Sequence, residues 1–493
     1  MRIVALFDIV IKLVTATSVL QHPTNLHYPA EMESQQLADA IRRTYATMER
    51  KEILGKLDSF PGARWLRVFW CDYSAGIKCR LIPLSLVKAK LRRGEPVTVA
   101  IIKASLGGLL PNDRMVPGVS AAGGYLLAPD WSSLRAGPTR GQITCVGEFH
   151  EKDGSAVAAC PRTALRTVLD RAEEEYGLEF ILGFEIEFTV MEMDKEGQYV
   201  AVRNDGHQWS TARNLADWGR PGAFASVLDD LADDLAAADI SIEQLHVESA
   251  PGQYEVVLSA APALRACDDY LLARQIVEAA AARGGFRVTM HPKLYPSAPG
   301  NAAHVHMSIA SGFGHDANMY EPFYAGILTH LRAVTAFTYA SPVSYERAAD
   351  SSWAGGRWVA WGSENRETPL RKCRDGHWEF RLLDGMANPY LALAAVLGAG
   401  ADGVARGMRL STWGQCLGDP AAMDEEERLA LGIDERLPGS LAEALDALEM
   451  SKRFGAVIGR DVVERQVAVK KAEIELFESM EEAERRQWII ARF

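Results

Sequence analysis

The sequence predicts an α+β protein in which a small N-terminal β domain precedes a much larger domain of mixed helices and strands. Short strands separated by Gly- and Pro-rich turns dominate residues 59–148, whereas amphipathic helices alternate with strands from about residue 149. The chain has 493 residues, 48% of them apolar and 24% charged, so it is long enough for at least two globular domains. We therefore divide it into an N-terminal extension with a helix, 1–58, and domains at 59–148 and 149–493.

The N-terminal part is expected to form one helix and a few short strands. Apolar residues at helical spacing predict a helix over 31–58. The run WLRVFWCDY at 65–73 is typical of a strand, and residues 75–84 of its hairpin partner. The Gly/Pro-rich stretch 107–124 predicts a loop, and its length favours a functional role because most connections are shorter. Residues 125–134 follow as a short strand and turn.

The larger domain begins with a predicted helix over 160–177, where Pro161 suits the first helical turn. The apolar run at 178–190 predicts a strand, and leucines at helical spacing predict a second helix over 226–238. Strands and helices then alternate to residue 411, and the chain beyond it has a helical pattern. This alternation is what makes the predicted fold class α+β.

Charge and cysteine content exclude some classes of function. The net charge of −12 argues against general nucleic-acid binding, which needs a basic surface. The seven cysteines are scattered and never spaced as CxxC, which favours reduced thiols and a cytoplasmic location. The apolar N-terminus is interrupted by Asp8 and Lys12, so it fits a packing or disordered extension better than a targeting signal or a membrane span. We therefore expect no membrane partner.

Two carboxylates share one face of the predicted strand GFEIEF. Because side chains alternate along a strand, Phe184, Ile186 and Phe188 point into a core while Glu185 and Glu187 point the other way together. Adjacent carboxylates repel each other and raise each other's pKa unless a cation lies between them. A solvated strand face is the alternative for this segment alone.

A second acidic segment favours the metal-binding interpretation. HVESAPGQYE predicts strand, tight turn and strand, which brings Glu248 and Glu255 onto neighbouring strands, with His246 on the face of Glu248. Inward carboxylates on a hairpin are hard to explain as core residues, although a surface hairpin is the alternative. Together the two segments offer four carboxylates for divalent cations.

Histidines and arginines complete the set of candidate residues. His304 and His306 alternate on one face of another predicted strand, and neutral imidazole suits Mn²⁺ better than Mg²⁺. Glu379 and Arg381 in WEFR also share a face. The arginines of this region, which could meet phosphate and carboxylate groups, are Arg347, Arg366, Arg371 and Arg381. Acids for metal and arginines for anions are typical of enzymes that use ATP.

Together these segments resemble the glutamine synthetase superfamily, over about residues 65–485. The motifs that carry the resemblance, in chain order, are GFEIEF, ESAPGQYE, MHPKLYP with HVHMS, ENRETPLR and EFRLLDGMANPYLALAA. The resemblance implies a β-grasp-like N-terminal domain and a catalytic domain with a curved antiparallel sheet and flanking helices. It also implies stacked homo-oligomeric rings of ten or twelve subunits, with active sites between neighbours.

Site residues are carried over from the family's motifs one position at a time. Glu187, Glu248 and Glu255 match the first metal site, and Glu185, His304 and Glu379 match the second. Arg347, Arg381 and Gly300 match positions at the carboxylate substrate, and Arg347 and Arg366 match catalytic positions. Positions matching nucleotide contacts are His306, Ser308, Arg366 and Arg371. ATP and two or more Mg²⁺ or Mn²⁺ ions per site are the implied cofactors.

The family's chemistry is the phosphorylation of the γ-carboxylate of glutamate, or of a similar acid, by ATP, followed by displacement of phosphate by ammonia or an organic amine. It implies a role in nitrogen metabolism and glutamine biosynthesis. Two other hypotheses stay open, namely a ring-forming scaffold or developmental signalling protein without turnover, and phosphoryl transfer without amide formation.

Two departures from the family's pattern concern the site for ammonium. A flap Glu that binds ammonium and takes its proton is replaced here by Trp353, an aromatic residue that cannot act as a base but could line a pocket for a larger amine. Asp350 is a candidate substitute for that base. The family's Asp-Gly-Ser-Ser latch from the neighbouring subunit is absent, and Asp113 is the one acid in the corresponding stretch.

Two further departures affect substrate and phosphate contacts. The usual Asn-Gly before the first histidine is replaced by the sequence of residues 299–301, and an expected arginine two residues before Glu379 is His377. A complete metal set with an altered ammonium site resembles the branch of γ-glutamyl-amine ligases and of the C-terminal halves of fungal developmental regulators. An organic amine is therefore favoured over ammonia as the acceptor.

Overall fold

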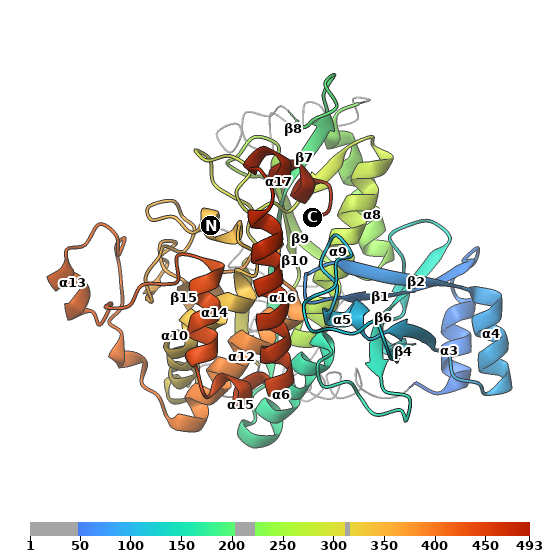
Figure 1. The fold of residues 1–493 in the computed structure, drawn as a ribbon, viewed down its shortest axis with the longest axis horizontal. Coiled ribbons are helices and arrows are strands. Elements are labelled where there is room, and N and C mark those ends of the chain that lie inside the picture. Colours follow the sequence, from blue (N-terminus) through green and yellow to red (C-terminus); the bar gives the residue numbers. More distant parts are fainter. Residues whose placement is uncertain (1–47, 203–221, 311–315) are drawn as a thin grey trace, which may run out of the picture.

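The computed structural model describes residues 48–202, 222–310 and 316–493, and it shows two sheets surrounded by helices (Figure 1). The predicted α+β fold class is confirmed. The extension 1–47, with the start of the helix predicted over 31–58, lies outside the described residues, and the described part of that helix is α3 (Arg50–Asp58). No helix of the described ranges has the length and apolar character needed to cross a membrane.

The first sheet has the order β2-β1-β6-β4-β3, with β5 on β6. Its strands are β1 (Trp65–Cys71), β2 (Ile77–Pro83), β3 (Val99–Ile102), β4 (Gly124–Pro129), β5 (Arg135–Ala136) and β6 (Gln142–His150). Strands β1 and β6 are parallel and the other pairs antiparallel, and a helix packs against the sheet, in agreement with the predicted β-grasp-like arrangement. The hairpin β1–β2 and the loop between α5 and β4 were both predicted.

The second sheet has the order β14-β15-β16-β13-β7-β10-β9, and β8, β11 and β12 also pair with β7. Its strands are β7 (Phe180–Met193), β8 (Tyr199–Ala201), β9 (Ile242–Val247), β10 (Gln253–Leu258), β11 (Ala261–Pro262), β12 (Arg287–Thr289), β13 (Val305–Ile309), β14 (Trp361–Ser363), β15 (Leu370–Arg374) and β16 (His377–Phe380). The predicted antiparallel pairing holds for all of these pairs except β14–β15, which is parallel.

Helices cover the apolar face of the second sheet. Phe184, Ile186 and Phe188 of β7 are each at most 1% exposed, as their alternation predicts, and Phe184 stacks on Tyr270 of α9. The helices α10 and α12 pack along each other, and five helices follow residue 411, as expected.

The described helices, with three short 3-10 turns, have the following bounds: α3 (Arg50–Asp58), α4 (Leu84–Arg93), α5 (Ala104–Gly107), α6 (Pro161–Tyr176), α8 (Leu228–Ala237), α9 (Ala263–Arg283), α10 (Ala317–Thr338), α11 (Ser344–Arg347), α12 (Pro389–Arg406), α13 (Glu425–Ala430), α14 (Leu441–Met450), α15 (Phe454–Ile458), α16 (Arg460–Glu478), α17 (Glu482–Ile490), η1 (Trp131–Ser133), η4 (Phe224–Val227) and η5 (Leu410–Thr412).

A buried ion-pair network joins the first sheet to the helices of the second. Arg162 of α6 forms ion pairs with Asp268 of α9 at 2.8 Å, with Asp130 at 2.7 Å and with Glu148 of β6 at 2.5 Å. The hydroxyl of Tyr390 donates to Asp268 over 2.6 Å. Because Arg162 is only 4% exposed, its charge depends on these partners rather than on water.

Replacing Arg162 by Met should lower the free energy of unfolding by about 3–5 kcal/mol, because three carboxylates then lose their buried cation. Chemical denaturation followed by circular dichroism measures this. Arg93→Met is the matched control, since Arg93 pairs with Glu95 at the surface and its loss should leave the denaturation midpoint unchanged. Equal midpoints for both variants would contradict a structural role of the network.

Candidate active site

One face of the second sheet carries acidic and histidine side chains on adjacent strands. His246 of β9 lies directly opposite Glu255 of β10, and Glu255 lies opposite Glu187 of β7. Directly opposed residues of paired strands project from the same face, so these three form a row across the sheet. Glu248 follows the end of β9 and turns back to the row. The hairpin predicted from HVESAPGQYE is thus confirmed.

The same face continues on the other side of β7. His306 of β13 lies opposite Glu379 of β16, which in turn lies opposite Arg371 of β15. His304 directly precedes β13, and its carbonyl accepts from the backbone N–H of Glu185 over 3.0 Å. Alternation along β7 places Glu185 on the face of Glu187, so six adjacent strands contribute to a single polar surface.

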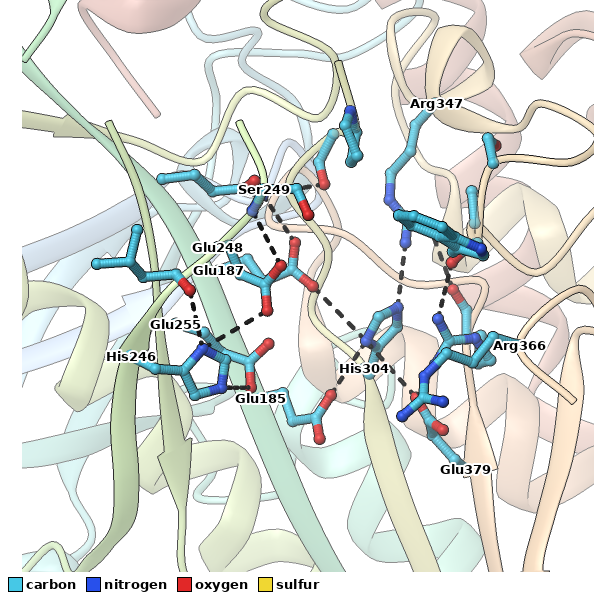
Figure 2. A pocket seen from close by; sticks show the side chains of 18 of the residues that line it. Glu185, Glu187, His246, Glu248, Ser249, Glu255, His304, Arg347, Arg366 and Glu379 are labelled. Atoms are coloured by element: carbon cyan, nitrogen blue, oxygen red, sulfur yellow. Dashed lines mark hydrogen bonds and ion pairs between the residues drawn. The ribbon is translucent and has the colours of Figure 1, made fainter. Parts of the chain in front are cut away.

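A cavity of about 470 Å³ opens over this surface. Two groups of labelled side chains face each other across it in Figure 2. On one side are Glu185, Glu187, Glu248 and Glu255, and on the other are His304, Arg347, Arg366 and Glu379. Twelve of the fourteen residues predicted for the site line it: Glu185, Glu187, Glu248, Glu255, Gly300, His304, Arg347, Trp353, Arg366, Arg371, Glu379 and Arg381. The structure therefore brings together residues that lie almost two hundred positions apart in the chain.

The first acidic cluster lies around His246. Its Nε2 is 3.2 Å from Glu255 Oε1 and its Nδ1 is 3.5 Å from Glu248 Oε1. Glu187 Oε2 accepts from the backbone N–H of Ala302 over 2.9 Å and from the amide of Gln253 over 3.0 Å. One ligand atom each of His246, Glu248 and Glu255 lies within 4.8 Å of the others, close enough to hold one metal ion.

The carboxylate charges of this cluster favour the binding of a metal cation. Burial, followed by the neighbouring charge of Glu255, raises the pKa of Glu187 well above its usual value. Burial and the charge of Glu185 raise the pKa of Glu255 to about 7. Both carboxylates are less than 10% exposed, so little water screens their repulsion. Oxygen donors in this number fit Mg²⁺ or Mn²⁺.

The second cluster consists of Glu185, His304 and Glu379. His304 Nδ1 lies 3.1 Å from Glu185 Oε2 and 3.6 Å from Glu379 Oε1. Burial and the cation of Arg381 lower the pKa of His304 to about 4, which keeps the imidazole neutral, as a metal ligand must be. Burial opposes ionisation of Glu379, but Arg381 together with the neighbouring imidazoles outweighs it and lowers the pKa of that carboxyl to about 2. Two oxygen donors and one nitrogen again fit a divalent cation, Mn²⁺ especially.

Arginines are fixed around the second cluster. Arg371 Nη1 donates to Glu379 Oε2 over 3.0 Å, and Arg381 Nη1 donates to the other oxygen of the same carboxylate. Arg347 is 3% exposed; it donates to Tyr339 over 2.8 Å and contacts His304 Nε2 at 3.1 Å. These forked cations border the cavity and are suited to bind anionic oxygens there.

The rim of the cavity is set by a flap around Trp353. The Trp353 backbone N–H donates to Glu367 over 3.0 Å, and its carbonyl accepts from Arg381 over 2.8 Å. Trp353 has a left-handed φ of 56°, which is uncommon for a bulky residue, and its side chain is 62% exposed. Strain of this kind occurs where the surroundings hold a segment in place. The ring is therefore held at the cavity mouth by its backbone.

Gly300 forms part of the wall for a steric reason. A Cβ at this position would lie 1.8 Å from the carbonyl oxygen of Pro292, so only glycine allows the two segments to approach each other. Next to it, Asn301 donates to the carbonyl of His291 over 2.9 Å. The altered sequence at 299–301 thus still produces a tightly packed wall.

Four predicted or candidate residues lie away from the cavity lining. His306 and Ser308 are on the same strand beside it, where His306 contacts Glu185 and Ser308 contacts His377. Asp350 pairs with Arg436 at 3.3 Å, and Asp113 lies exposed on the loop after α5. The roles of these residues in nucleotide binding or in proton removal stay predictions.

Three residues that shape the site are not among those predicted from the sequence. His246 was placed on the correct face but given no ligand role, although its position two residues before Glu248 was a usable signal. Gln253, which orients Glu187, alternates with Glu255 in the same motif and could also have been found. Tyr339, which holds Arg347, has no signal in the local sequence because the contact comes from packing between separate segments.

Comparison with known proteins agrees with this arrangement. Residues 158–489 match the family described as glutamine synthetase, catalytic domain. Protein fluG of Emericella nidulans is 34% identical over 490 residues, which are 97% of this chain and 54% of that protein, so the chain spans about half of its length. A γ-glutamylpolyamine synthetase of Streptomyces coelicolor is 33% identical over 67% of this chain and 72% of its own.

Solved structures show the same fold. A glutamine synthase homolog has a TM-score of 0.71 at 25% identity, covering 87% of this chain and 99% of the other. A GmaS/ADP complex has a TM-score of 0.75 at 24% identity, covering 89% of this chain and 99% of its own, a likeness of fold alone.

Metal binding at the first cluster should weaken as pH falls. Because burial raises the pKa of Glu255 to about 7 and also raises the pKa of Glu187 well above its usual value, the metal must displace protons below pH 7. Apparent Mn²⁺ affinity should therefore drop by about tenfold per pH unit from pH 7 to 6, measurable by calorimetry. For the same reason the metal-free fold should lose stability as pH rises through this range.

The variant Glu255→Gln tests the assignment, because it removes one titrating ligand without changing the side-chain shape. It should bind Mn²⁺ more weakly at pH 8 and show a shallower dependence on pH. Glu192→Gln, on the exposed end of β7, is the control and should behave as the unmodified protein. An affinity that does not change with pH would contradict the cluster as a metal site.

Proposed function

The chain belongs to the glutamine synthetase family, and on that premise we propose that it is an ATP- and divalent-metal-dependent ligase that joins an amine to the γ-carboxylate of glutamate or a similar acid. The observation that carries the proposal is the pair of ligand clusters that face one cavity, with arginines fixed at its border. Such a set of charges suits phosphoryl transfer, in which several anionic oxygens must converge.

Each of the two ligand clusters is a proposed binding site for one metal ion. Glu187, Glu248 and Glu255, with His246 beside them, would hold one Mg²⁺ or Mn²⁺ ion, and the second cluster would hold another. When bound, these ions would supply charge neutralisation for the phosphate oxygens of ATP. Arg366 lies on the side of the second cluster (Figure 2), and Arg371 donates to Glu379 of that cluster over 3.0 Å. Both arginines border the cavity, where they would contact the phosphates.

The chain's own residues orient the reactants. Arg381 is fixed between Glu379 and the Trp353 carbonyl, so its remaining donors are preorganised for a substrate carboxylate. Arg347 is buried and anchored by Tyr339 beside His304, where its guanidinium would lie next to the carboxylate to be phosphorylated. Transfer of the γ-phosphoryl group then gives ADP and an acyl phosphate. Attack by the amine forms the amide, and phosphate and one proton leave.

The acceptor is proposed to be an organic amine. Trp353 places an aromatic ring at the mouth of the cavity, where it can contact the carbon chain or the cation of an amine, whereas it cannot accept a proton from ammonium. The Streptomyces coelicolor relative is named a γ-glutamylpolyamine synthetase, which supports an extended amine. Ammonia is the competing acceptor.

Three further parts of the proposal follow from the family. We expect homo-oligomeric rings of ten or twelve subunits, a cytoplasmic location and a role in nitrogen metabolism. The competing hypothesis is a ring-forming scaffold without turnover. It gives no reason for the buried carboxylates Glu187 and Glu255 of the first cluster, whose repulsion destabilises a fold that binds no cation.

Phosphate release by the purified protein with ATP and Mg²⁺ or Mn²⁺ tests the reaction. Release should require glutamate, should rise with mono-, di- or polyamines, and should fall by at least about a hundredfold in Glu187→Gln, which loses a metal ligand. Mass spectrometry should identify the γ-glutamyl amide. Glutamate-dependent release with ammonia alone would instead indicate a glutamine synthetase, and no release from assembled rings would favour the scaffold.

Trp353→Glu tests the role of the flap. The change should shift the ratio of kcat/KM for ammonia to that for the best organic amine upward by about tenfold or more, because a carboxylate can bind ammonium and accept its proton. Trp353→Phe, which keeps an aromatic ring, should leave that ratio near its original value. An unchanged ratio in Trp353→Glu would remove this residue from amine selection.

A further inference from the structure

A third cluster of potential ligands lies beside the two carboxylate clusters. It consists of His306 on β13, His377 on β16 and Cys373 on β15, with one donor atom of each within 4.8 Å of the others. His306 Nδ1 and His377 Nε2 are 2.9 Å apart, and the two rings stack with centroids at 5.0 Å. None of the three lines the active-site cavity. Two imidazoles and a thiol are softer donors than carboxylates, and they favour softer metal ions than Mg²⁺.

A β-bulge directs Cys373 toward the histidines. Lys372 pairs with Trp378 and Arg374 pairs with His377, which leaves Cys373 as the extra residue of β15. Its side chain is half-buried and hydrogen-bonds the ring of His306. A bulge re-aims a side chain at the expense of ladder hydrogen bonds, and such irregularities are frequent beside functional sites. The sheet is thus distorted at the residue that completes the cluster.

Each imidazole is oriented by a polar side chain on the side of the ring that faces away from the cluster. His306 Nε2 lies 3.0 Å from Glu185 Oε1, and His377 Nδ1 lies 3.1 Å from Ser308 Oγ. When each of these nitrogens donates its proton outward, the inner nitrogens present their lone pairs to the same point. A carboxylate or hydroxyl behind the ring is the usual support of a metal-binding histidine. His377 is only 6% exposed, so the atoms packed around it hold its ring in this orientation.

We propose that His306, Cys373 and His377 form a binding site for a soft divalent transition-metal ion such as Zn²⁺. Zinc takes nitrogen ligands at about 2.0–2.1 Å and a thiolate at about 2.3 Å, so two nitrogens on one ion lie roughly 3.4 Å apart. The two nitrogens are now 2.9 Å apart, so moving them apart by about half an ångström gives that N–N spacing. Glu185 and Glu379 lie close to the cluster and offset the positive charge of the ion.

The site has a consequence for catalysis that rests on the proposed function. His306 and Ser308 match nucleotide contacts of the family, and an ion at the third cluster would engage one of them directly and the other through His377. Zn²⁺ should therefore raise the apparent KM for ATP. The site itself does not depend on that function, because binding is measured without turnover.

Cobalt substitution tests the site directly. Co²⁺ added to metal-free protein in excess Mg²⁺, which occupies the oxygen-rich clusters, should give a thiolate-to-cobalt charge-transfer band in the near ultraviolet at one equivalent per chain. Zn²⁺ should abolish the band. Absence of the band, or a band that Zn²⁺ does not displace, overturns the proposal, because a proton shared between the imidazoles then suffices to explain their contact.

Variants identify the ligands. Cys373→Ser should eliminate the band, and His377→Gln should weaken Zn²⁺ binding by more than about tenfold. Cys79→Ser is the matched control, since Cys79 is the other half-buried cysteine of the described residues. It should keep the band and the affinity. Circular dichroism and oligomer size establish that each variant is folded, and a band that survives Cys373→Ser in folded protein contradicts the assignment.

Discussion

Repulsion among buried carboxylates is the constraint on which the rest of this structure depends. Glu187, Glu248 and Glu255 face one another at the polar surface of the second sheet, where little water screens them. The fold tolerates this because Gln253 and the Ala302 backbone donate to Glu187, and because histidines stand between the acids. The second cluster is balanced differently, since Arg371 and Arg381 hold Glu379 ionised. The first cluster therefore relies on His246, whose pKa is raised to about 9 by its contact with Glu255, whereas two arginines already neutralise part of the second.

The sheet can carry these charges because one of its faces is apolar and packed against helices, whereas the other is polar and lines the cavity. The side chains of β7 that point away from the cavity pack against α9, which fixes the strand and hence the spacing of Glu185 and Glu187. Ligands on paired strands are held more rigidly than ligands on loops. The flap with Trp353 is the exception, since it belongs to neither sheet nor long helix and borders the cavity where substrates enter.

Much of the site could be predicted from the sequence because it follows from short-range periodicity. Alternation alone places Glu185 and Glu187 on the face opposite Phe184 and Phe188, and the turn after Glu248 brings Glu255 next to it. The order of the strands could not be predicted in this way, because β13 and β16 pair through segments that are distant in the chain. The stacking of His377 on His306, the bulge at Cys373 and the Arg162 network all arise from such pairings. The family resemblance supplied what periodicity could not, namely the prediction of which acids share a metal.

The central position of β7 has a consequence for synthesis of the chain. Strand β7 ends at Met193, but its partner β13 begins at Val305 and the covering helix α9 at Ala263. At about 5–20 residues per second, a ribosome needs roughly 5–20 seconds to make the segment that closes this edge. Until β13 is made, one edge of β7 stays unpaired, and an unpaired strand edge is a template for aggregation. Slower synthesis of residues 194–304 would therefore lengthen the interval in which nascent chains can associate through this edge.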